Sequence, residues 1–135
     1  MSYQLSFEHR YYYNLLESGI TVEVILQSGG RVVHQSAKID TGAQYCIFSR
    51  EIGEDLGLHI EAGLRKEMQS LTGTLVTYGH EVTLETLGLE CTTFVFFSEQ
   101  RKLPRNLLGR TGWLQLVRLA IIDYDQVLYL SHYDG

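Results

Sequence analysis

Apolar and polar residues alternate along short segments of this chain, and turn residues separate the segments. Apolar and polar residues alternate over residues 20–26, which predicts a strand, and residues 27–30 (Gln-Ser-Gly-Gly) predict a turn. The returning strand of this hairpin is expected to begin at residue 31 and to run to residue 40. Further β-prone segments lie at residues 11–13, 46–48, 66–70, 75–78, 81–85, 92–97, 106–108, 119–122 and 126–130. Many short strands at this spacing predict an all-β barrel or sandwich.

Helical signals are few. Ser49 is a suitable N-cap for a short helix over residues 50–56, and Gly57 is a suitable stop. Gly53 weakens that helix by about 1 kcal/mol. Residues 112–114 predict either a second short helix or the start of a final hairpin, and residues 131–135 read as a polar tail.

The most informative segment is Ala-Lys-Ile-Asp-Thr-Gly-Ala at residues 37–43, because it places Asp40 on a tight turn directly after an apolar strand. Gly42 permits a positive φ or a close backbone approach, and the hydroxyl of Thr41 can form a hydrogen bond across a symmetry axis. Taken alone, Asp-Thr-Gly also suits a purely structural turn. The segment Asn-Leu-Leu-Gly-Arg at residues 106–110 supplies the context that favours a catalytic role.

Together the two segments resemble the signature segments of retropepsin-like (retroviral-type) aspartic peptidases, and the resemblance covers about residues 20–130. It implies an acid-protease barrel in which residues 106–110 form a strand that threads the loop of the catalytic Asp40. Thr41, Gly42 and Ala43 would complete that loop. Phe-Ser before the predicted helix and Leu-Gly-Leu after it are similar to bacterial members of the group.

The resemblance also implies a flap, a β-hairpin that folds over the substrate. The hairpin predicted at residues 66–78 has the right position between the two signature segments. An ordinary hairpin is the alternative from local sequence alone. The residues expected to contact substrate are Gln44, Leu71, Thr72, Gly73, Leu108 and Arg110.

One Asp-Thr-Gly supplies one carboxylate, whereas this chemistry uses two carboxylates around one water. The resemblance therefore implies a C2 homodimer with two facing Asp40 residues, cleaving extended peptides without a cofactor or a metal ion. Substrates with largely apolar side chains around the scissile bond are expected. The alternative is a retropepsin-fold dimerisation or peptide-binding module with weak or no activity.

Gln44 and the flap tip depart from the retroviral pattern, whereas Ala43 matches the alanine of retropepsins. Retroviral enzymes commonly have an Asp where this chain has Gln44, and that Asp pairs with the arginine equivalent to Arg110. A neutral Gln44 can instead bond Arg110 or the substrate backbone. Ala43 replaces the serine of pepsin-like enzymes, which predicts activity into mildly acidic or near-neutral pH. The flap tip has a single glycine, Gly73.

Bulk properties narrow the function further. The 135 residues predict a single domain, residues 1–135, with its core at about residues 20–130. The net charge of −5 argues against nucleic-acid binding, and no apolar run is long enough to span a membrane. The first residues do not resemble a signal peptide, so a cytoplasmic protein is expected. Cys46 and Cys91 have no metal-binding spacing and are expected to be small buried hydrophobes.

Overall fold

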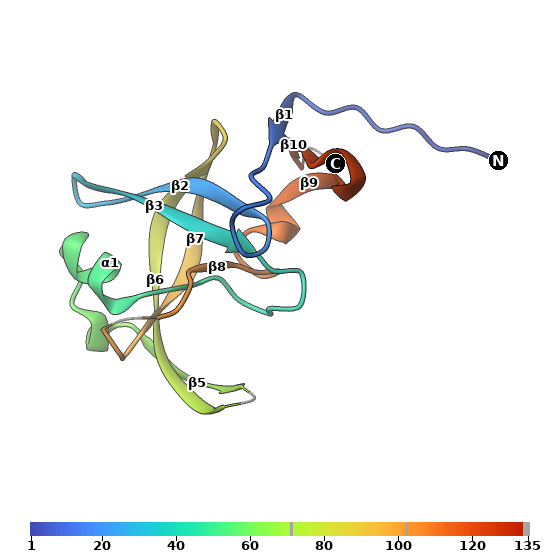
Figure 1. Ribbon diagram of the computed structural model, residues 1–135. Helices are drawn as coiled ribbons and strands as arrows, with labels where there is room; N and C mark the ends of the chain where they lie inside the picture. Colours follow the sequence, from blue (N-terminus) through green and yellow to red (C-terminus); the bar gives the residue numbers. More distant parts are fainter. Residues whose placement is uncertain (71, 102, 134–135) are drawn as a thin grey trace.

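The computed structural model describes residues 1–70, 72–101 and 103–133, and it confirms the all-β prediction (Figure 1). The chain has ten strands and one short α-helix over these ranges. The strands are β1 (His9–Tyr12), β2 (Thr21–Ser28), β3 (Arg31–Ile39), β4 (Ile47–Phe48), β5 (Leu64–Ser70), β6 (Gly73–Thr86), β7 (Leu89–Ser98), β8 (Leu107–Leu108), β9 (Val117–Ile122) and β10 (Val127–His132). The helix α1 is Arg50–Asp55, and the 3₁₀ turns are η1 (Ile60–Ala62), η2 (Leu114–Leu116) and η3 (Asp123–Asp125).

Seven strands form one sheet in the order β2-β3-β8-β4-β7-β6-β5. The long strand β6 pairs with β5 over Gly73–Gly79, with β7 over Thr77–Thr86 and with β2 over Thr83–Thr86. The pairing between β2 and β6 closes the sheet into a barrel. Closure satisfies backbone groups that an open edge would leave unpaired.

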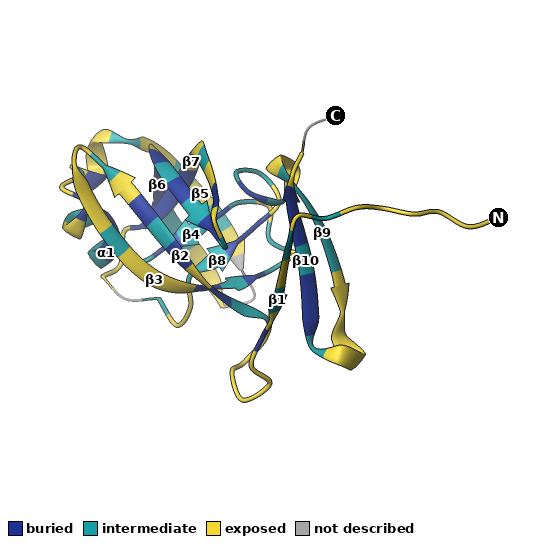
Figure 2. Cartoon of the chain, turned by 90° about the horizontal axis from the view of Figure 1, so that it is seen from above, coloured by how far each residue is buried: buried dark blue, intermediate teal, exposed yellow. Residues whose placement is uncertain are grey.

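The remaining strands form a separate sheet in the order β1-β10-β9, which stands beside the barrel in Figure 2. The predicted outer strand at residues 11–13 is confirmed in part, because β1 ends at Tyr12. The predicted polar tail is wrong for its first two residues. Ser131 and His132 belong to β10, and the buried hydroxyl of Ser131 accepts a hydrogen bond from the backbone N–H of Glu8 at 2.6 Å.

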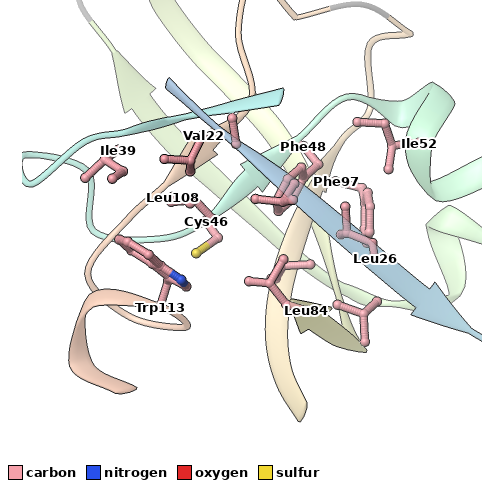
Figure 3. Close-up of a cluster of buried hydrophobic side chains, with 14 of the residues drawn as sticks. Val22, Leu26, Ile39, Cys46, Phe48, Ile52, Leu84, Phe97, Leu108 and Trp113 are labelled. Atoms are coloured by element: carbon pink, nitrogen blue, oxygen red, sulfur yellow. The ribbon is translucent and has the colours of Figure 1, made fainter. Parts of the chain in front are cut away.

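The two sheets share one hydrophobic core, which includes Leu128 and Leu130 of β10 together with side chains of the barrel. Figure 3 shows Trp113 beside Cys46 and Leu108, beneath the strands that lead into the Asp40 loop. Full burial of one large apolar side chain contributes about 1.5–3 kcal/mol. Packing on this scale gives the loop a rigid support.

The helix α1 lies against this core. It ends at Asp55, one residue before the predicted end, and Ser49 occupies the N-cap position without a side-chain capping bond. Gly53 is buried in the helix, and an added Cβ would lie 2.5 Å from Cδ1 of Ile60 and 2.9 Å from Cδ1 of Phe97. The glycine therefore permits close packing of the helix, at the expense of helix propensity.

Tyr13 connects the segment before β2 to the turn between β9 and β10. Its backbone N–H donates to the carbonyl of Gln126 at 3.1 Å, and its buried hydroxyl donates to Oδ1 of Asp123. Burial and the hydrogen bond to the Asp123 carboxylate raise the pKa of Tyr13 to about 12. The fold thus stabilises the neutral phenol.

We expect the free energy of unfolding of Tyr13→Phe to fall less between pH 8 and pH 11 than that of the wild type. The neutral phenol contributes fully below its unfolded pKa of 10.0, and this contribution is lost as the pH rises towards the folded pKa of about 12. Urea unfolding at pH 8 and pH 11 would compare the variant with the wild type and with Tyr124→Phe, since Tyr124 is exposed. If the free energy of unfolding fell equally between pH 8 and pH 11 in all three proteins, this role for Tyr13 would be contradicted.

Candidate active site

The two signature segments meet in the centre of the seven-stranded sheet. Strand β8 runs parallel to β3, with Ile39 opposite Leu108, and antiparallel to β4, with Ile47 opposite Leu107. It therefore lies between the two strands that the Asp40 loop connects, which is the threaded arrangement that the family resemblance implies. The backbone N–H of Asp40 donates to the carbonyl of Leu108 at 3.0 Å, so the threading strand fixes the start of the loop.

The Asp40 carboxylate is half-buried and held by its own loop. Its Oδ1 accepts a hydrogen bond from the backbone N–H of Gly42 at 2.9 Å, and its carbonyl accepts one from the N–H of Ala43 at 3.2 Å. An added Cβ on Gly42 would lie 3.3 Å from Oδ1. Of the two roles predicted for Gly42, the close approach is the one observed, because its φ is outside the left-handed region.

The second signature segment binds the far side of the same loop. The N–H of Arg110 donates to the carbonyl of Ala43 at 2.9 Å, and the N–H of Thr111 donates to the carbonyl of Gln44 at 2.7 Å. Gly109 lies so close to the loop that an added Cβ would be 2.3 Å from the carbonyl oxygen of Tyr45 and 2.8 Å from that of Ala43. Only glycine fits there, because contacts of that length do not occur for a real Cβ.

Gln44 has a partner that the sequence analysis did not anticipate. Its Nε2 donates to Oγ1 of Thr111 at 2.8 Å, so its partner within the chain is Thr111 and not Arg110. The side chain of Arg110 is exposed and forms no ion pair with the carboxylates that the structure describes. This neutral hydrogen bond links the Asp40 loop to the residue that follows the second signature segment.

Cys46 is the last residue of the Asp40 loop and directly precedes β4. Its thiol is fully buried, and its Sγ accepts a hydrogen bond from the N–H of Gly109 at 3.4 Å. Burial raises the pKa of Cys46 to about 12. The thiol therefore stays protonated and packs as a small hydrophobe, as predicted, whereas Cys91 is only partly buried.

The hairpin expected to serve as a flap consists of β5 and β6. The register pairs Leu64 with Gly79 at its base and Ser70 with Gly73 near its tip. Figure 1 shows this hairpin extending from the barrel below the Asp40 loop. Thr72 and Gly73 are exposed at the tip, and Leu71 lies outside the described residues.

A groove of about 510 Å³ separates this hairpin from the Asp40 loop. Its described lining combines loop, strand and hairpin residues: Gly42, Ala43, Gln44, Tyr45, Ile47, Lys66, Glu67, Met68, Gln69, Leu75 and Leu107. Of the residues predicted to contact substrate, Gln44 lines the groove. Thr72, Gly73 and Arg110 do not line it in this structure.

The prediction for Leu108 is corrected, since its side chain is completely buried in the core. Neighbouring residues on a strand point to opposite faces, so Leu107 faces the groove in its place. Tyr45, Lys66 and Leu75 also line the groove, although they were not among the residues predicted to contact substrate. Alternation along residues 64–70 could have indicated that Lys66 and Met68 share one face of the hairpin.

The barrel, its threaded central loop and the facing hairpin define a retropepsin-like fold built around an Asp-Thr-Gly site. Residues 20–111 match the family model described as aspartyl protease, and the chain belongs to this family. A structure of the EIAV protease complexed with the inhibitor HBY-793 is similar, with a TM-score of 0.56 and 21% identity, covering 74% of this chain and 88% of that chain. No match is found among curated proteins.

These findings confirm the predicted retropepsin-like resemblance and the fold class, and the family supports a protease. The similarity to bacterial members stays a prediction. In the described part of the chain, no helix is long and apolar enough to cross a membrane. The cytoplasmic location stays a prediction as well.

Proposed function

We propose that this chain is a homodimeric aspartic endopeptidase in which two symmetry-related Asp40 carboxylates activate one water molecule. The observation that carries the proposal is the position of Asp40. The half-buried Asp40 accepts a hydrogen bond from the N–H of Gly42 at its carboxylate, and backbone hydrogen bonds fix its position on a threaded loop, beside a groove of about 510 Å³. A turn with only a structural role would not require a groove beside it.

The chemistry needs two carboxylates that share one proton. One carboxylate removes a proton from the water, which attacks the scissile carbonyl carbon, while the protonated carboxyl donates to the carbonyl oxygen. Collapse of the tetrahedral intermediate then breaks the C–N bond, and the leaving nitrogen takes a proton from the pair. Two like charges at close range resist joint ionisation, which favours a state in which the pair shares one proton.

A homodimer is the arrangement that supplies the second carboxylate, because the sequence holds a single Asp-Thr-Gly. Thr41 follows Asp40 and is exposed, so its hydroxyl is available to the loop of a partner copy near the axis. Gly42 places its backbone against the groove, where no side chain obstructs an extended substrate. The apolar part of the groove suits apolar side chains around the scissile bond.

Incubation with a diverse peptide mixture between acidic and near-neutral pH, followed by mass spectrometry, tests this function. We expect cleavage between apolar residues and a specific activity that falls on dilution, because the dimer dissociates. Activity independent of dilution down to the nanomolar range would contradict an exchanging dimer. A folded dimer without cleavage at any pH would favour the alternative, a peptide-binding module with the same fold.

A further inference from the structure

Lys66 is a charged residue on the wall of the groove between the Asp40 loop and the hairpin. Lys66 and Met68 are half-buried on the face of β5 that lines the groove, whereas Arg65 and Glu67 are exposed. Glu67 also borders the groove, but its Oε1 is paired with Nη2 of Arg65 at 3.0 Å. Lys66 forms no ion pair with any carboxylate among the described residues, so none of those carboxylates compensates its positive charge.

The ammonium group of Lys66 is positioned by an aromatic ring. Its Nζ lies 5.0 Å from the ring centroid of Tyr45, within the range of a cation–π contact. Tyr45 is itself fixed by an edge-on contact with Phe96, with centroids 5.0 Å apart at 65°, and by a parallel bridge to Thr111. The contact between Lys66 on the hairpin and Tyr45 on the Asp40 loop therefore spans the groove.

Apolar side chains lie beside this charge. Ile47, Leu75 and Leu107 line the groove and continue into an adjoining hollow of about 220 Å³, whose lining also includes the exposed Arg105. Within the groove itself, a substrate would combine apolar side chains with one anionic side chain at Lys66. A carboxylate brought to Lys66 would gain a charge-assisted hydrogen bond, and a neutral amide of the same shape would gain less.

We propose that Lys66, held on the ring of Tyr45, forms a subsite that selects a Glu or Asp side chain near the scissile bond of the substrate. The inference rests on the proposed peptidase function and specifies its substrate class: apolar peptides with an acidic residue beside the apolar pair. Lys66 acts here as a specificity-determining residue and takes no part in bond cleavage.

A matched peptide series tests the subsite. Starting from an apolar peptide that the wild type cleaves, each position outside the scissile pair is changed in turn to Glu or to Gln, and kcat/KM is measured. We expect one position at which Glu is preferred over Gln by about three- to fivefold at low ionic strength. The preference should shrink at high salt, since salt screens a partly exposed pair.

Variants of the enzyme separate this subsite from a general charge effect. Lys66→Gln should reduce the Glu/Gln ratio to about one, and Lys66→Glu should reverse it in favour of neutral or basic residues. Arg31→Gln removes one positive charge from an exposed position outside the groove and should leave the ratio unchanged. A wild-type ratio near one at every position, or a preference that survives Lys66→Gln, overturns the subsite and leaves the peptidase intact. Absence of cleavage of every peptide overturns both proposals.

Discussion

Replacing Asp40 with Asn is expected to lower kcat/KM by about 10³-fold or more while the protein stays folded. The amide cannot take a proton from water, so the general-base step is lost, and steps of this kind are worth about 10²–10⁴-fold. The fold should survive because Oδ1 of Asn can still accept the hydrogen bond that the N–H of Gly42 donates at 2.9 Å. Steady-state cleavage of one identified peptide, together with urea unfolding, gives both quantities.

Asp55→Asn is the matched control for this variant. Asp55 is exposed at the end of α1, so the same loss of one negative charge should leave kcat/KM unchanged. Equal cleavage by Asp40→Asn and wild type would contradict a catalytic role. Failure of Asp40→Asn to fold would assign Asp40 a structural role in the loop.

Gly109→Ala is expected to have the largest effect on stability, with a loss of about 3 kcal/mol or more. The added methyl would lie 2.3 Å from the carbonyl oxygen of Tyr45 and 2.6 Å from its carbonyl carbon, and neither backbone atom can move aside as a flexible side chain would. The Asp40 loop and β8 must therefore separate. Because the loop carries Asp40, the proposed catalytic group, activity should fall with stability, and urea unfolding with a parallel peptide assay measures both.

Gly29→Ala separates steric conflict from the general cost of replacing a glycine. Gly29 has a φ of +54°, and an added Cβ meets nothing within 4 Å. Its replacement should cost only about 1–2 kcal/mol, from backbone strain, without loss of activity. Equal destabilisation by the two variants would show that the contact between Gly109 and the loop does not support the site.

Local patterns were sufficient to predict most of the barrel. Alternation over residues 20–26 and the Gly-Gly turn predicted the β2–β3 hairpin, which is observed as Thr21–Ser28 and Arg31–Ile39. The threading of the loop by residues 106–108 followed from the resemblance to a known family, not from periodicity. A two-residue strand that pairs with β3 and β4 has too few residues to reveal its partners.

Pairings between segments that lie far apart in the sequence could not be predicted from local patterns. Strand β10 pairs with β1 on one edge and with β9 of the same chain on the other. In β1–β10, His9 pairs with Leu130, and no local signal encodes such a contact. The same limit applies to Lys66 and Tyr45, which meet only after the hairpin has folded over the loop.

Mixing wild type with Asp40→Asn at a fixed total concentration tests the central claim most directly, because it asks whether two Asp40 carboxylates act together. If subunits exchange freely and both carboxylates are required, an equal mixture should retain about a quarter of the wild-type activity, since only that share of dimers is fully wild type. Activity should follow the square of the wild-type fraction across the series. A linear dependence, with about half the activity at equal mixing, would mean that each chain works with its own Asp40 alone and would contradict the shared site.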